Sequence, residues 1–199
     1  MKSNVCKLEK GTSALDAILH ESQKVASYNS FTNKQTLQLR LLCEELDGML
    51  PKLIDNYEGE FWIEYENNVC KITTNIKLAE LTTSKKKELI NLSKSKKNAA
   101  SVGIVGKIRS AIEDFFLDEK NFQNYNISSS FYHLSNDYGV GVDYSYLWSL
   151  SQYKNSVQQE EKQESWDELE KSIIASLADD VIVGVKGKQA SIVVIKKFA

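Results

Sequence analysis

Residues 60–76 read EFWIEYENNVCKITTNI, and this stretch decides the fold class. Apolar side chains alternate with charged or polar ones in both halves of it, which is the period of a half-buried β-strand. The Asn67-Asn68 dipeptide between the halves tolerates positive φ and therefore predicts a two-residue hairpin turn. With such a turn Ile63 pairs with Ile72, so the apolar faces of the two strands coincide, which supports this register.

Two helices are predicted before the hairpin. Residues 12–28 place apolar side chains toward one face of a helix. A second helix is expected to begin near Thr32, because Thr32 and Gln35 have the spacing of a capping box. Its leucines recur at steps of three and four and form a core-facing stripe: Leu39, Leu42, Leu46, Leu50 and Leu53. Gly48 and Pro51 indicate that this helix kinks or ends near residue 50.

The chain after the hairpin also alternates helices and strands. Residues 107–118 predict an amphipathic helix, residues 126–143 a strand and turn, and residues 144–159 another helix. A further helix is expected over residues 165–178, and two apolar runs around Lys186-Gly187-Lys188 predict a terminal hairpin. Hairpins separated by helices imply an α+β fold, a two-layer sandwich in which helices cover one face of a mixed, mostly antiparallel sheet.

The composition fits a single domain over residues 1–199. Apolar residues make up 42% of the chain and charged residues 26%, which is typical of a globular protein. The formal net charge of −2 provides no general attraction to nucleic acid or to an anionic membrane. No run of about 18 apolar residues predicts a membrane span, and the first residues lack an apolar secretory segment. We therefore expect a cytoplasmic protein that binds neither nucleic acid nor membrane.

The cysteines do not have the spacing of a disulfide framework or a zinc site. Cys6, Cys43 and Cys70 are an odd number without a CxxC pair, and they are interpreted as reduced, mostly buried thiols. A hydrolase that uses Cys43 or Cys70 with His133 is disfavoured, because both cysteines fall on apolar faces where a thiol is inert.

Two segments point to a known family. RLLCEELDGML at residues 40–50 lies on the leucine-striped helix, and SVGIVGKI at residues 101–108 opens the helix after the hairpin. Together with the order helix–helix–hairpin–loop–helix–hairpin, these segments resemble the GHKL superfamily of ATP-binding domains. That superfamily is best known in sensor histidine kinases and in anti-sigma-factor serine kinases. The resemblance implies a Bergerat-like fold with a nucleotide site.

The resemblance identifies residues 40–50 as the N-box helix of the family. There a glutamate activates water or a hydroxyl, and an asparagine about one turn later holds Mg²⁺. Glu44 stands in the place of the glutamate and Gly48 in the place of the asparagine, with Asp47 as the nearest oxygen-bearing neighbour. The resemblance therefore implies that Glu44 is the catalytic base and that Glu45 and Asp47 belong to the nucleotide site, whereas Gly48 departs from the family's metal site.

The adenine and phosphate contacts follow from the same resemblance. Thr74 or Asn75, on the second strand of the hairpin, stands at the adenine-reading position, although no glycine follows as it does in the family. Gly103 and Gly106 resemble the second glycine box, and Lys107 adds a cation at a helix N-terminus. Such a terminus presents free amides and a positive dipole end to an anion. The implied cofactors are ATP or ADP, with Mg²⁺ as a further candidate.

Two assignments stay open. Residues 82–97 take the position of the family's mobile lid, and residues 120–164 are an insertion or a partner-binding element. The helix expected over residues 165–178 also leads into a hairpin, as the second-box helix does. In that case Gly103 and Gly106 belong to the insertion. Each candidate site also has a purely structural explanation, because helix carboxylates can simply face solvent and glycines can permit close packing.

The resemblance leads to two functional expectations. The first is a regulatory ATP-binding protein similar to anti-sigma-factor kinases, with weak or no catalysis and a protein partner bound at residues 120–164. The second is a non-catalytic protein-interaction module that kept the GHKL-like fold and lost nucleotide binding. A change of Glu44 separates them, because only an enzyme loses activity when a general base is removed.

Overall fold

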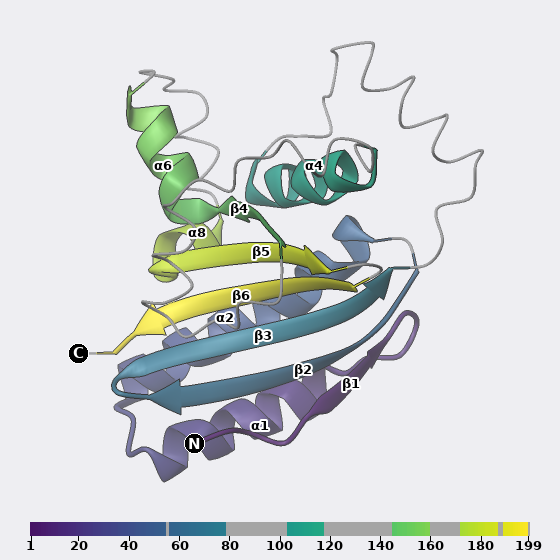
Figure 1. Cartoon of the computed structure of the whole chain (residues 1–199). Helices are drawn as coiled ribbons and strands as arrows, with labels where there is room; N and C mark the ends of the chain where they lie inside the picture. Colours follow the sequence, from purple (N-terminus) through teal and green to yellow (C-terminus); the bar gives the residue numbers. More distant parts are fainter. Residues whose placement is uncertain (55, 79–102, 118–144, 160–171, 187–188, 199) are drawn as a thin grey trace.

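The computed structural model describes residues 1–54, 56–78, 103–117, 145–159, 172–186 and 189–198. Its centre is a six-stranded sheet of order β1-β2-β3-β6-β5-β4, and every neighbouring pair is antiparallel (Figure 1). The strands are β1 Cys6–Glu9, β2 Tyr57–Glu66, β3 Val69–Leu78, β4 Ser145–Ser149, β5 Asp180–Lys186 and β6 Gln189–Lys197. The described helices are α1 Leu15–Tyr28, α2 Asn33–Leu53, α4 Gly103–Leu117, α6 Leu150–Gln159 and α8 Ile173–Leu177. The predicted α+β class is confirmed.

The β2–β3 hairpin has the predicted register and turn. Ile63 lies opposite Ile72. Asn67 and Asn68 have φ angles of 50° and 63°, and two successive left-handed residues are what a type I′ turn requires. Because one face of this hairpin is buried, a slip of one residue would turn its apolar side chains toward solvent.

Helices α1 and α2 contact each other and lie on one face of the sheet, behind the strands in the view of Figure 1. The predicted capping box at the start of α2 is confirmed. The main-chain amide of Gln35 donates to Oγ1 of Thr32 at 3.3 Å, and the amide of Thr32 donates to Oε1 of Gln35 at 2.9 Å. Two amides of the first turn, which have no partner inside the helix, are satisfied in this way.

Helix α2 ends slightly later than expected. It runs to Leu53, with Pro51 inside its last turn. A proline removes one amide donor from a helix. The next turn still closes, because the amide of Ile54 donates to the carbonyl oxygen of Leu50 at 3.1 Å.

The main core fills the space between the helices and the face of the sheet that they cover. The two strands of the hairpin contribute Phe61 and Ile72, both fully buried. The leucine stripe of α2 is buried as predicted: Leu39, Leu42, Leu46, Leu50 and Leu53. Helix α4 adds an isoleucine row of its own: Ile104, Ile108 and Ile112. Each fully buried side chain of this size stabilises the fold by about 1.5–3 kcal/mol.

The prediction of one helix over residues 144–159 was wrong in its first part. The chain forms strand β4 before helix α6 begins at Leu150. Tyr146 and Trp148 of this strand lie opposite Gly184 and Val183 of β5. Tyr146 and Trp148 are separated by one residue, which is the period of a strand and not of a helix.

Helix α4 begins earlier than expected, at Gly103 rather than at residue 107. Both glycines of the second glycine box therefore lie within the helix and not in a loop before it. The strand and turn predicted over 126–143, the lysine-rich residues 82–97 and the first part of the helix predicted over 165–178 lie outside the described residues. The predicted terminal hairpin is confirmed as β5 and β6.

The sheet also buries side chains on its other face. Ile182, Val193 and Ile195 are at most 4% exposed, and they pack with Val69 as a second, smaller apolar cluster. On strands, neighbouring side chains point to opposite faces, so this cluster is separated from the helical layer by the sheet itself. Within the part of the chain that the structure covers, no helix has both the length and the apolarity to cross a membrane.

Candidate functional site

Glu44, the residue implied as a catalytic base, forms an ion pair on the surface of α2. Nε of Arg40 donates to Oε1 of Glu44 at 2.9 Å, and the two residues are one turn apart. The side chain of Glu44 is 34% exposed. A general base accepts a proton from substrate or water, so the carboxylate would have to exchange this guanidinium for a reacting group.

Asp47 lies one turn after Glu44 on the same side of α2, because residues three apart are neighbours on a helix. Its carboxyl is half-buried, and burial raises its pKa above the ordinary value. Tyr57, at the start of β2, is close to it: burial raises the pKa of Tyr57, and the charge of Asp47 raises it further. Glu45 follows Glu44 in the sequence and is therefore rotated by about 100° from it around the helix axis, so it does not lie on the side of Glu44 and Asp47. Gly48 is exposed, and a Cβ added there would meet open space.

Helix α4 brings the second glycine box against α2. It contacts α2, β4 and β5. Gly103, its first residue, has a left-handed φ of 71°, a conformation that glycine adopts without strain. Gly106 is buried within the helix, which suits close packing of the backbone more than a loop around a phosphate. The structure therefore brings Gly103 and Gly106 onto the helix that packs against α2.

Lys107, in the second turn of α4, contacts an aromatic ring of α6. Its Nζ lies 5.3 Å from the ring centroid of Tyr153, within the range of a cation–π contact. The ring of Tyr153 is in turn 6.0 Å from that of Trp148 on β4. Tyr153 therefore connects α6 with α4 through Lys107 and with β4 through Trp148.

Asn75 lies on the opposite side of the sheet from Glu44. Its neighbours Thr74 and Ile76 are fully buried on the helical face, so the side chain of Asn75 points to the other face. There its Oδ1 is buried, with no hydrogen-bond partner among the residues that the structure describes. Thr74, the alternative adenine-reading residue, faces the helices, and its Oγ1 donates to the carbonyl oxygen of Ile192 at 3.4 Å. The structure thus groups Glu44, Asp47 and α4 on one face and leaves Asn75 on the other.

Asp180 was not singled out from the sequence, yet it is the most heavily bonded acid among the described residues. It is 1% exposed. It accepts from the amide of Ser151 at 3.0 Å, the hydroxyl of Ser151 at 2.9 Å, the hydroxyl of Ser149 at 3.2 Å and the amide of Val181 at 2.8 Å. These contacts cap the start of α6 from β5. The sequence signal was the Ser-x-Ser pair at 149–151, but its acidic partner is distant in the chain.

The thiols are not set up as nucleophiles or ligands. Cys6, Cys43 and Cys70 are free and buried, as predicted. Burial raises the pKa of Cys70 to about 12 and that of Cys43 well above its ordinary value. Protonated thiols neither attack carbonyls nor bind metals. Across the described ranges, no three His, Cys, Asp or Glu side chains are grouped to bind a metal ion, and His133 lies outside those ranges.

The comparisons with known proteins found no match: no protein-family model, no curated protein and no solved structure matches the chain.

Proposed function

We propose that this chain is a regulatory domain that binds ATP or ADP beside the contact of α2 with α4, with weak or no catalysis. The observation that carries the proposal is that α4, which opens with left-handed Gly103, packs against the side of the molecule formed by α2. A helix start offers free amides and a positive dipole end to phosphate groups. Two carboxylates of α2, Glu44 and Asp47, share one side of that helix.

The proposed site has one set of contacts for the phosphates and another for the metal ion. The first turn of α4 and the ammonium group of Lys107 meet the phosphates, and Lys107 leaves the ring of Tyr153 to do so. Asp47 is the carboxylate that would hold Mg²⁺ if the ion accompanies the nucleotide, because Mg²⁺ in nucleotide sites is commonly bound by one or two carboxylates and the phosphates themselves. Its raised pKa would fall again beside a cation. Asn75 is not part of the proposed site, because it lies on the other face of the sheet. Thr74 lies on the face that the helices cover.

Nucleotide titration of the purified chain tests the proposal. We expect ATP and ADP to raise the unfolding temperature at millimolar concentration, because a ligand that binds only the folded state stabilises it. Lys107→Ala should weaken binding about fivefold, the equivalent of about 1 kcal/mol for one lost phosphate contact. Lys34→Ala is the matched control, since Lys34 is an exposed lysine in the first turn of α2, about three turns before Glu44. Absence of any stabilisation by either nucleotide, with or without Mg²⁺, would refute the proposal.

A non-catalytic interaction module is the second candidate. Three observations favour it: the open space at Gly48, the Arg40–Glu44 ion pair, and Asn75 on the far side of the sheet. In that case the fold serves as a scaffold for a protein partner, and nucleotide leaves the unfolding temperature unchanged. The same titration therefore separates the two candidates.

A further inference from the structure

Strand β1 is an open edge of the sheet. It is the outermost strand beside β2, and no described strand pairs with its other side. The amide of Lys10, just after β1, donates to the carbonyl oxygen of Tyr57, the residue directly opposite it, at 3.1 Å. Because main-chain groups point alternately to the two sides of a strand, this bond shows which residues of β1 bond to β2. Cys6 and Leu8 therefore direct their main-chain groups toward β2, whereas Lys7 and Glu9 direct theirs toward the open edge.

The side chains at this edge carry opposite charges. Lys7 and Glu9 are both exposed, and Cys6 and Leu8 between them are buried. Glu9 lies opposite Glu58 of β2, so its cross-strand neighbour has the same charge and gives it no stabilisation, whereas Lys7 lies opposite Glu60. An added strand that offers a cation opposite Glu9 and an anion opposite Lys7 would match this edge.

A second copy of the same strand meets that requirement in one register. Antiparallel self-pairing must place residues with outward main-chain groups opposite one another, so three centres are available: Lys7, Leu8 and Glu9. Centring on Lys7 places two lysines face to face, and centring on Glu9 places two glutamates face to face. Centring on Leu8 places Lys7 of each copy opposite Glu9 of the other, which forms two ion pairs across the edge.

We propose that two copies of this chain associate through β1 in the register centred on Leu8, so that their sheets join into one. Association is weak, for two reasons. The strand is short, and the carbonyl oxygen of Glu9 already accepts from the amide of Thr12 at 3.2 Å. In the dimer the carbonyl oxygen of Glu9 must therefore accept from two amides, that of Thr12 and that of Lys7 in the second copy. Native edge strands are commonly protected by short length, charged side chains, proline or bulges. Strand β1 is short and charged, so only the opposite signs of Lys7 and Glu9 favour pairing.

Charge exchange between two single variants gives a sharp test by sedimentation over a range of concentrations. Lys7→Glu alone sets acid against acid in the dimer, and Glu9→Lys alone sets base against base, so each variant should dissociate at least about tenfold more readily than the wild type. An equimolar mixture of the two variants restores both ion pairs, so the mixture should dimerise where neither variant does. The double variant Lys7→Glu/Glu9→Lys should dimerise like the wild type.

Two controls separate this pairing from other effects. Lys52→Glu makes the same change in net charge as Lys7→Glu, but at an exposed position of α2, and should leave association unchanged. Lys7→Pro removes the outward amide while leaving the bonds between β1 and β2, so it should give a folded monomer by circular dichroism. A wild type that stays monomeric throughout, or a dimer that neither Lys7→Glu nor Lys7→Pro disturbs, overturns the proposal. The result does not depend on nucleotide binding.

Discussion

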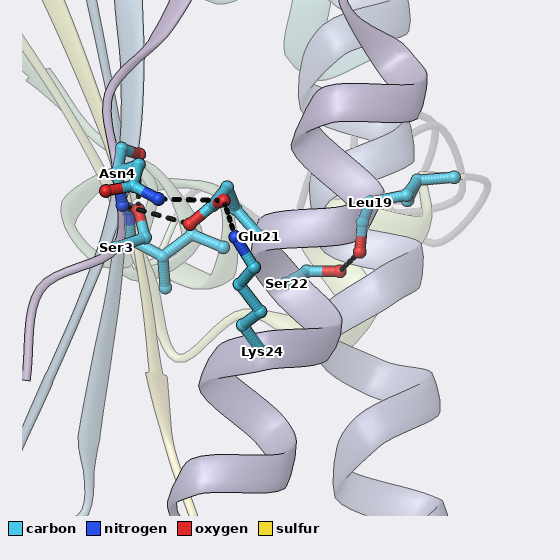
Figure 2. A network of polar contacts seen from close by, with 7 residues as sticks. Ser3, Asn4, Leu19, Glu21, Ser22 and Lys24 are labelled. Atoms are coloured by element: carbon cyan, nitrogen blue, oxygen red, sulfur yellow. Dashed lines mark hydrogen bonds and ion pairs between the residues drawn. The ribbon is translucent and has the colours of Figure 1, made fainter.

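Asn4 donates to the buried carboxylate of Glu21 through both its main-chain amide, at 3.0 Å, and its side-chain amide, at 3.1 Å (Figure 2). Nζ of Lys24 completes the site at 2.7 Å. The pairing of the first residues with β2 shifts by one residue between Lys2 and Cys6. This irregularity frees Asn4 from the ladder and turns it toward α1, as a β-bulge does. The N-terminal segment is thereby fastened to a helix as well as to the sheet.

Glu21→Gln tests how much this anchor stabilises the fold. The glutamine keeps the size of the side chain but loses the charge. Its NH₂ group would also face one of the groups that now donate to the carboxylate, so two donors would meet. We expect the free energy of unfolding to fall by about 1.5–3 kcal/mol, the usual range for a hydrogen-bonded buried charge. Urea denaturation at neutral pH measures it. Lys24→Ala is the control, because its ion pair is partly exposed and should contribute less than about 1 kcal/mol.

The same carboxylate predicts a pH dependence. Burial raises the pKa of Glu21, but the hydrogen bonds from Lys24 and Asn4 outweigh burial, so its pKa lies below the ordinary value. A depressed pKa in the folded state means that the stabilisation is present above the unfolded value, about 4.3, and is lost as the pH falls through the folded value. The stability difference between wild type and Glu21→Gln should therefore shrink below about pH 4. A difference that stays constant down to pH 2 would show that the charge is not responsible.

Asp180→Asn should be among the most destabilising changes in the chain. The new amide nitrogen would face donors that now bond to a carboxylate, so at least one buried donor loses its acceptor. We expect a loss of about 2–3 kcal/mol in unfolding free energy. Ser151→Ala removes one donor and leaves the acid intact, so it should cost about 1 kcal/mol. Equal losses for the two variants would mean that the hydroxyl, and not the carboxylate, organises the start of α6.

Two glycines give opposite predictions for the same change. A Cβ on Gly59 would fall on the carbonyl oxygen of Asn75 in the neighbouring strand, so Gly59→Ala must move the backbone and should cost about 1–3 kcal/mol. A Cβ on Gly48 meets open space inside a helix, so Gly48→Ala should add about 0.5–1 kcal/mol. Thermal unfolding of the two variants against the wild type measures both. A loss of stability in Gly48→Ala would contradict the open space at this position.

Local signals account for the parts of the fold that were predicted well. The Asn67-Asn68 turn and the capping box of Thr32 and Gln35 are each set by neighbouring residues, and both have the expected geometry. Strand β4 was missed although its sequence alternates: Tyr146 and Trp148 are separated by one residue, as side chains on one face of a strand are. Only its partner, β5, is distant in the sequence and has no local signal.

The placement of the candidate residues likewise divides into local relations, which the sequence contains, and distant contacts, which it does not. Helix spacing correctly places Glu44 and Asp47 on one side of α2, since that relation is local. The face of the sheet on which Asn75 lies depends on which alternate residues of β3 enter the core, and the alternation of Thr74 and Ile76 already contained this information. The burial of Glu21 and Asp180 could not be predicted, because Asn4 and Ser151, which donate to them, lie on distant parts of the chain.

Glu44→Gln decides between an enzyme and a scaffold. If Glu44 acts as a general base, ATP hydrolysis should fall about a hundredfold or more, while nucleotide affinity changes little, because the glutamine cannot accept the proton. Arg40→Ala releases the same carboxylate from its ion pair at 2.9 Å and should raise the rate instead. Glu66→Gln, an exposed glutamate at the end of β2, controls for the loss of one negative charge. If hydrolysis is equal in the wild type and Glu44→Gln, this residue is a surface ion-pair partner of Arg40, and the domain works by binding alone.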